Sequence, residues 1–195
     1  MLLDMEIDIK CLQSEVANLP AKLWNSSANR VSTQRHVNSI FLRGYAPAEG
    51  DKPIHDREIL KYLPYCREIL ESKFYATPQR CLLARLASRQ AIKPHIDHGQ
   101  YFSNNVRVHI PIVSNSSTWM MCAGLFYTMQ EGEAWALNNS ALHAVWNGHP
   151  TQSRTHLICD FSLTSELHSL LLSGKRHMGK ANPEVELAIR RARTP

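Results

Sequence analysis

The sequence lacks both a long hydrophobic run and the pattern of a signal peptide at its start. No apolar stretch approaches the roughly 20 residues that a helix needs to cross a bilayer. Residues 1–10 carry Asp4, Glu6 and Asp8 among their apolar side chains, whereas a secretory signal has a basic start and an uninterrupted apolar segment. We therefore expect a cytoplasmic protein that does not act on a membrane or on lipid.

Paired cysteine motifs are also missing. The chain has five cysteines and no CxxC spacing, and the cysteines are Cys11, Cys66, Cys81, Cys122 and Cys159. A scattered, odd-numbered set favours neither a disulfide framework nor a structural zinc site. We expect reduced thiols, most of them buried.

Positive charge is in modest excess, with a formal net charge of +5. Much of it lies late in the chain, at Lys175, Arg176, Lys180, Arg190, Arg191 and Arg193. No aromatic residues interleave with these cations as a stacking surface would require, so nucleic-acid binding is disfavoured and a solvated helix is the simpler interpretation. A positive balance also suits an enzyme that binds anionic small molecules.

Length and composition favour one globular domain spanning residues 1–195, with 44% hydrophobic and 20% charged residues. Residues 1–78 mix helix and strand signals, and we interpret them as support for a β core at residues 79–164, with a helical segment at 165–195. The expected helices are residues 11–19, residues 56–74 with a break near Pro64, and residues 184–193 after Pro183. A short strand is expected at residues 38–44.

The β core is indicated by short apolar runs separated by turn residues. The runs lie at residues 81–87, 106–113, 124–129, 134–137, 141–146 and 155–161. Many short strands at this spacing predict a sandwich or a jelly-roll barrel. The fold class is therefore mainly β with flanking helices.

Alternation within two of these runs places polar residues on one face. Arg107 and His109 share a face of their strand, opposite an apolar face. Arg154 and His156 likewise point the same way. Buried polar groups of this kind need partners, and an anionic ligand would supply them.

The most informative motif is His95-Ile96-Asp97. Residues i and i+2 of a strand point to the same face, so the imidazole and the carboxylate would lie together. The motif alone is weak, and ten histidines make a chance partner easy to find. His143 is a better third candidate than His149, because it lies inside a strand-like run rather than in a Gly-Pro loop. Two histidines and a carboxylate form the facial triad of non-haem Fe(II) oxygenases.

From residue 82 to residue 161 the chain resembles the aspartyl/asparaginyl β-hydroxylase family of Fe(II)/2-oxoglutarate-dependent oxygenases. The order and spacing of several segments carry the resemblance. They are KPHID at residues 93–97, VRVHIP at 106–111, EGEAW at 131–135, HAVWN at 143–147 and SRTHLICD at 153–160.

The resemblance implies a double-stranded β-helix, a cupin-like jelly roll, with helices packed outside. It further implies that the iron ligands are His95, Asp97 and His143, with O2 as the oxidant, and that Arg154 binds the distal carboxylate of 2-oxoglutarate. Two further residues, Arg107 and His109, would contact the other carboxylate of 2-oxoglutarate or the substrate.

Three features bear on how far the resemblance extends. The family usually has a Pro-Gly turn before the first histidine, where this chain has Ser88-Arg89. An aspartate often stands five residues before the second histidine, where this chain has Asn138, and that change could alter a contact to the histidine. The presence of Asp97 favours hydroxylation over halogenation, because a halide would need the coordination position of a missing carboxylate.

The expected substrate is a small amino acid or a short peptide with an Asp, Asn or Pro-like side chain, since some family members hydroxylate free proline. Candidate substrate contacts are Arg43, His98, Tyr101 and Trp119, although Arg43 reads equally as a solvated strand residue. Nothing in the sequence sets the oligomeric state, and a homodimer is among the arrangements left open.

Two alternatives from other classes remain. A cupin-like metal-binding protein without 2-oxoglutarate chemistry would keep the histidines but would have no reason to hold Arg154. A non-catalytic nucleic-acid-binding protein would rely on the late basic residues, and would tolerate loss of the triad.

Overall fold

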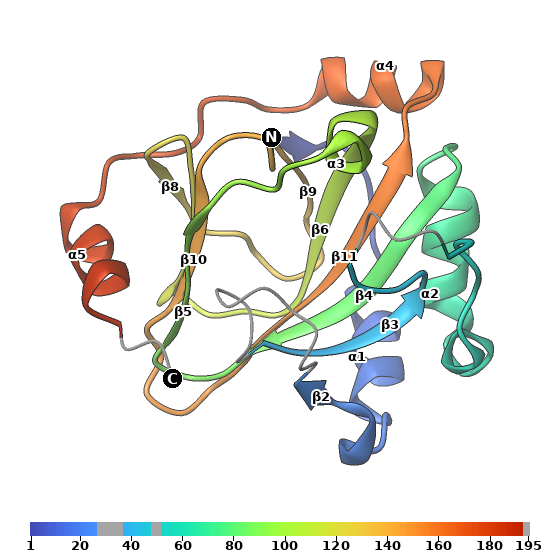
Figure 1. Cartoon of the computed structure of the whole chain (residues 1–195), viewed down its shortest axis with the longest axis horizontal. Helices are drawn as coiled ribbons and strands as arrows, with labels where there is room; N and C mark the ends of the chain where they lie inside the picture. The colour runs from blue at the N-terminus through green and yellow to red at the C-terminus, as the bar shows by residue number, and fades with distance from the viewer. Residues whose placement is uncertain (27–36, 48–51, 193–195) are drawn as a thin grey trace.

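The computed structural model describes residues 1–26, 37–47 and 52–192, and two antiparallel sheets dominate it (Figure 1). The larger sheet has seven strands in the order β1-β9-β6-β11-β4-β3-β2, and the smaller has four in the order β5-β10-β7-β8. The strands of the larger sheet are β1 (Leu2–Leu3), β2 (Asn25–Ser26), β3 (Val37–Arg43), β4 (Pro78–Leu86), β6 (Asn105–Val113), β9 (Ala134–Leu137) and β11 (Arg154–Ser162). Those of the smaller are β5 (Gln90–His95), β7 (Thr118–Cys122), β8 (Leu125–Tyr127) and β10 (His143–Asn147).

Helices lie on the outside of this pair of sheets (Figure 1). They are α1 (Ile9–Ala17), η1 (Ala21–Leu23), η3 (Glu58–Tyr62), α2 (Pro64–Glu68), η4 (Ile69–Lys73), α3 (Gln100–Asn104), α4 (Ser165–Ser173) and α5 (Pro183–Arg191). Within the described ranges, no helix is both long and apolar enough to span a membrane.

The two faces of the larger sheet have different partners. On β6, the side chains of Val108, Ile110 and Ile112 are fully buried in a cluster that includes Leu12 of α1 and Cys66 of α2. This apolar face packs against the helices, as the alternation predicted. The opposite face of β6 therefore directs its polar side chains toward the smaller sheet.

Helix boundaries follow from local chemistry. The Asp8 carboxylate accepts a hydrogen bond from the Cys11 amide at 3.0 Å and so caps α1. The predicted break near Pro64 is confirmed, because η3 ends at Tyr62 and Pro64 takes the first position of α2, where its missing N–H costs nothing. The strand expected at residues 38–44 is β3.

The late helix α5 docks on the smaller sheet. Its Val185 and Ile189 are buried against Met121 and Ala144. The Lys93 ammonium of β5 donates to the backbone carbonyls of Ile189, Arg190 and Ala192 at 2.7, 3.2 and 2.6 Å. These carbonyls have no partner within the helix, so Lys93 closes its C-terminus. The solvated helix expected here is therefore exposed on one side only.

Four strands were not among the runs expected from the sequence, and these are β1, β2, β5 and β7. β5 carries Pro94, which is tolerated because β5 is an edge strand of its sheet. β7 contains Trp119, which the sequence offered as a candidate substrate contact, followed by two methionines. β10 pairs with both, and its register sets His143 opposite His95. β5 ends at His95, so Asp97 follows the strand instead of lying on it as expected, and its backbone bonds to the turn before β10.

Candidate metal centre

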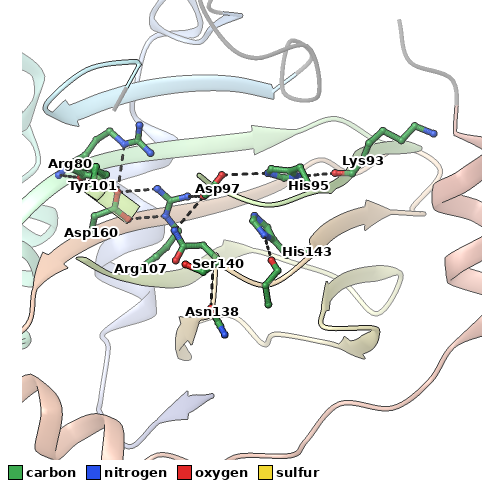
Figure 2. A network of polar contacts seen from close by, with 12 residues as sticks. Arg80, Lys93, His95, Asp97, Tyr101, Arg107, Asn138, Ser140, His143 and Asp160 are labelled. Atoms are coloured by element: carbon green, nitrogen blue, oxygen red, sulfur yellow. Dashed lines mark hydrogen bonds and ion pairs between the residues drawn. The ribbon is translucent and has the colours of Figure 1, made fainter. Parts of the chain in front are cut away.

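Three of the sequence-predicted residues meet at the end of the smaller sheet. One ligand atom from each of His95, Asp97 and His143 lies within 4.8 Å of the others. The two imidazole centroids are 4.2 Å apart, and His95 Nε2 is 3.7 Å from Asp97 Oδ1. Figure 2 shows these three side chains pointing toward one another.

Backbone carbonyls orient both imidazoles. His95 Nδ1 lies 2.8 Å from the Lys93 carbonyl and His143 Nδ1 lies 3.0 Å from the Ala141 carbonyl. A carbonyl can only accept, so each Nδ1 carries the proton and each Nε2 keeps its lone pair. Burial also lowers the pKa of His143, with the charge of His95 next in importance. A neutral imidazole of fixed tautomer is the form that binds metal, so the residues present fit a divalent metal ion.

Asp97 is held by three hydrogen bonds. Its backbone amide donates to the Asn139 carbonyl at 3.0 Å. Its Oδ2 accepts from Arg107 Nη1 at 2.5 Å and from Asn139 Nδ2 at 3.4 Å. The other oxygen, Oδ1, is the one nearer His95. The carboxylate thus has one oxygen bound by protein donors and one oxygen toward the two histidines.

A cavity of about 410 Å³ opens on this triad. Seven of the predicted residues line it, and these are His95, Asp97, His98, Arg107, His109, His143 and Arg154. Its apolar walls include Phe41, Phe102 and Met120. Of the described residues that line it, Asp97 is the one carboxylate, whereas Arg107 and Arg154 are cations. The positive charge of the lining favours anionic ligands.

Arg154 is the most unusual group in this cavity. It is 1% exposed, and within the described ranges no carboxylate pairs with it. Its Nη2 lies 2.6 Å from His156 Nδ1, which must accept because the guanidinium only donates. Burial lowers the pKa of Arg154 to about 9, which leaves it protonated at neutral pH. A buried cation without a counter-charge calls for an anion from outside the chain.

Two neutral histidines flank Arg154. Burial holds the pKa values of His109 and His156 well below the usual range, and the charge of Arg154 adds to the effect. The ring centroids are 5.7 Å apart. Both ring nitrogens of His109 and Nε2 of His156 are buried and have no hydrogen-bond partner among the residues that the structure describes. These nitrogens could donate to or accept from a bound carboxylate.

The remaining predicted substrate contacts lie outside the cavity lining in the described part of the chain. Arg43 turns to Asp56, with its Nη1 2.6 Å from Asp56 Oδ1, and its Nε donates to the Pro78 carbonyl. Trp119 packs beside the cluster under α5. Tyr101 donates to Asp160 at 3.1 Å, so it acts behind the cavity wall rather than on it.

The structure places Asn138 and Arg89, two residues at which the sequence departs from the family pattern, in turns. Asn138 Oδ1 accepts from the Ser140 amide at 3.2 Å and shapes the turn before β10, rather than touching His143. Arg89 has a positive φ of 55° in the turn between β4 and β5. Sequence reasoning did not single out Asp160, which lies on the same strand as Arg154 and His156. Its pairing with Arg107 depends on the register of β6 and β11, which the sequence does not reveal.

Comparison with known proteins agrees with this geometry. The family model for aspartyl/asparaginyl beta-hydroxylase matches residues 11–163. An L-proline cis-4-hydroxylase of Rhizobium meliloti (strain 1021) is 24% identical over 166 residues, which are 85% of this chain and 57% of that protein. The chain thus spans just over half the length of this curated relative.

A solved structure shares the fold. An oxidoreductase of the 2OG-Fe(II) oxygenase family from Burkholderia pseudomallei superimposes with a TM-score of 0.52 at 13% identity, over 80% of this chain and 77% of that one. The jelly-roll fold is therefore confirmed. With the family match covering most of its length, this chain belongs to the aspartyl/asparaginyl beta-hydroxylase family.

Proposed function

We propose that the protein is an Fe(II)/2-oxoglutarate-dependent dioxygenase that hydroxylates an unactivated C–H bond of an amino acid or a peptidyl side chain. The reaction would couple this hydroxylation to decarboxylation of 2-oxoglutarate to succinate. One observation carries the proposal: Arg154, a buried cation with no counter-charge in the described part of the chain, lines the same cavity as the His95–Asp97–His143 triad. A metal site alone would not need it.

His95 Nε2, His143 Nε2 and Asp97 Oδ1 would hold the iron. Iron supplies a place where O2 and a 2-oxo acid react together, and three protein ligands leave coordination positions for both. The protein's own part is to fix these ligands. The carbonyls of Lys93 and Ala141 set the two imidazole tautomers, and Arg107 with Asn139 occupies the second oxygen of Asp97.

Arg154 would bind the distal carboxylate of 2-oxoglutarate. Its free donors and the partnerless nitrogens of His109 suit a carboxylate in a dry site, where a charge-assisted hydrogen bond is strong. Arg107 already has carboxylate partners on two sides. Its remaining N–H groups would contact the other carboxylate of the 2-oxo acid or the substrate.

Cavity size and one relative bear on the substrate class. The cavity volume of about 410 Å³ suits small ligands. The rhizobial relative is a proline hydroxylase by name, which supports a free amino acid as the first substrate to try. A second cavity of about 600 Å³ shares Phe102, Met120 and Leu137 with the first and leaves room for a longer substrate.

We place the reaction in the cytoplasm, in keeping with five free thiols.

The test is succinate release from 2-oxoglutarate by the Fe(II)-loaded protein under air. A panel of free L-amino acids, with proline, aspartate and asparagine first, is compared with short peptides containing the same residues. Stimulation by one substrate, with stoichiometric hydroxylated product by mass spectrometry, supports the proposal. A metal-replete protein that neither binds 2-oxoglutarate nor forms succinate would instead be a cupin-like metal-binding protein.

A further inference from the structure

Asp160 lies behind the metal site, where it forms an ion pair with Arg107 through two hydrogen bonds. It belongs to β11, and its side chain is 2% exposed. The register of β11 and β6 sets it directly opposite Arg107. Arg107 donates to it twice, from Nε to Oδ1 at 2.8 Å and from Nη2 to Oδ2 at 2.9 Å. This two-pronged geometry is the strongest form of such a pair.

Further contacts fix Asp160 from the other side. Tyr101 donates its hydroxyl proton to Oδ2 at 3.1 Å, and the Arg80 guanidinium lies 3.6 Å from the same oxygen. Burial alone would raise the pKa of Asp160, but the charge of Arg107 and its hydrogen bonds lower it below its ordinary value. Asp160 is therefore a fixed negative charge.

Arg107 connects this charge to the metal site. Its third donor, Nη1, reaches Oδ2 of Asp97. Within the described ranges, Asp97 and Asp160 are its carboxylate partners, and Figure 2 shows its guanidinium lying between the two. Asp97 Oδ1, on the side of His95, receives none of these bonds.

We propose that Asp160 is a positioning residue for the metal centre, which holds the Arg107 guanidinium and offsets its charge so that Asp97 stays a full-strength metal ligand. The inference rests on the metal site of the proposed function. Without Asp160, Asp97 would be the one carboxylate left, among the described residues, to offset the charge of Arg107. The uncompensated part of that charge would then repel a divalent ion bound at Asp97. A residue that only stabilised the fold would have no such effect on metal binding.

Charge counting gives the proposal a sharp test. Asp160→Asn keeps the shape of the side chain but leaves the site one unit more positive. Arg107→Met with Asp160→Asn removes one charge of each sign and restores the original balance. Metal affinity should therefore fall in the single variant and return in the double variant. Simple structural damage would accumulate instead, and the double variant would bind metal no better than the single one.

The experiment is calorimetric titration of metal-free protein with Co(II) or Mn(II), without 2-oxoglutarate and without O2. We expect Asp160→Asn to bind the ion at least about tenfold more weakly than the wild type, because one uncompensated charge in a buried site has a large effect. The double variant should lie within about threefold of wild type. Asp56→Asn, which removes a surface partner of Arg43 and Arg67, is the control and should leave affinity unchanged.

A second variant guards against misfolding of the first. Asp160→Glu keeps the charge but adds a methylene, so it should retain metal affinity better than Asp160→Asn if charge is what matters. Wild-type affinity in Asp160→Asn, or a double variant as weak as the single, would overturn the inference while leaving the metal site intact. A wild type that binds no divalent metal would overturn the metal site itself, and with it the proposed function.

Discussion

Two arginines are buried on the same side of the larger sheet, and they differ in their partners. Arg107 has two carboxylates, Asp97 and Asp160. Arg154 has none among the described residues, and a histidine nitrogen takes one of its donors. Burial alone would lower the pKa of both guanidiniums. The carboxylates raise the pKa of Arg107 above its ordinary value, whereas the pKa of Arg154 falls to about 9.

The difference separates a structural cation from a binding cation. A buried charge that is already neutralised within the chain holds other groups in place. A buried charge left uncompensated weakens the fold, and a ligand of opposite charge would offset that cost on binding. In this chain the first kind holds Asp97, which we propose as a metal ligand, and we propose that the second kind marks the site for an anion.

The largest expected difference is in the free energy of unfolding, which substitution of the two arginines should change in different ways. Arg107→Met leaves Asp160 buried without its main partner, and we expect a loss of about 3–5 kcal/mol in the free energy of unfolding. Arg154→Met removes an uncompensated charge, so metal-free protein should be as stable as wild type or more so. Urea unfolding followed by circular dichroism measures both. Equal destabilisation by the two variants would contradict the distinction.

The next effect concerns 2-oxoglutarate. Arg154→Met should weaken its binding to the metal-loaded protein by about hundredfold, since a buried charge-assisted pair is lost. Metal affinity should not fall, because Arg154 is none of the three candidate ligands and its substitution removes a positive charge from the cavity. Calorimetry of both ligands checks this, with Arg190→Met on the exposed surface of α5 as the matched control. Unchanged 2-oxoglutarate binding would remove Arg154 from the site.

A smaller effect comes from the histidines beside Arg154. The pKa values of His109 and His156 are well below 6.5 in the folded protein, so below pH 6.5 the unfolded chain binds more protons than the folded one. Stability should therefore fall as the pH drops from 6.5 to 5.5, by up to about 1.4 kcal/mol per histidine.

Urea unfolding of metal-free protein at pH 7.5, 6.5 and 5.5 measures this slope. His156→Gln should reduce it, whereas His177→Gln, a change at an exposed histidine, should not. A stability that is flat across this range would show that neither buried histidine resists protonation.

The smallest effect tests a cation whose partners are carbonyls. Lys93→Met removes three hydrogen bonds to the end of α5 and should lower the free energy of unfolding by about 1–2 kcal/mol. Lys61→Met, which breaks an exposed pair with Glu58, should cost under about 1 kcal/mol. Equal effects would mean that the docking of α5 does not depend on Lys93.

The cluster of His95, Asp97 and His143 could be predicted from the sequence because the signals of its members are local. His95 and Asp97 are two residues apart, and His143 interrupts an apolar strand where an imidazole needs a reason to be. The polar face of β6 could be predicted for the same reason, because alternation with period two is a property of the strand itself.

What the sequence could not supply was pairing between distant strands. Asp160 meets Arg107 only through the register of β11 on β6. Arg43 was proposed as a substrate contact, but in the fold it meets Asp56. β5 was missed because its proline and lysine obscure the strand pattern, which an edge position tolerates.

The most direct test of the account is an anaerobic titration of the Fe(II)-loaded protein with 2-oxoglutarate, followed by visible absorption. Chelation of iron by a 2-oxo acid should produce a charge-transfer band in the wild type. The band should be absent in His95→Ala and should need far more 2-oxoglutarate in Arg154→Met. No band in iron-loaded wild type, or the same titration curve in Arg154→Met, would contradict the assignment of this cavity to 2-oxoglutarate.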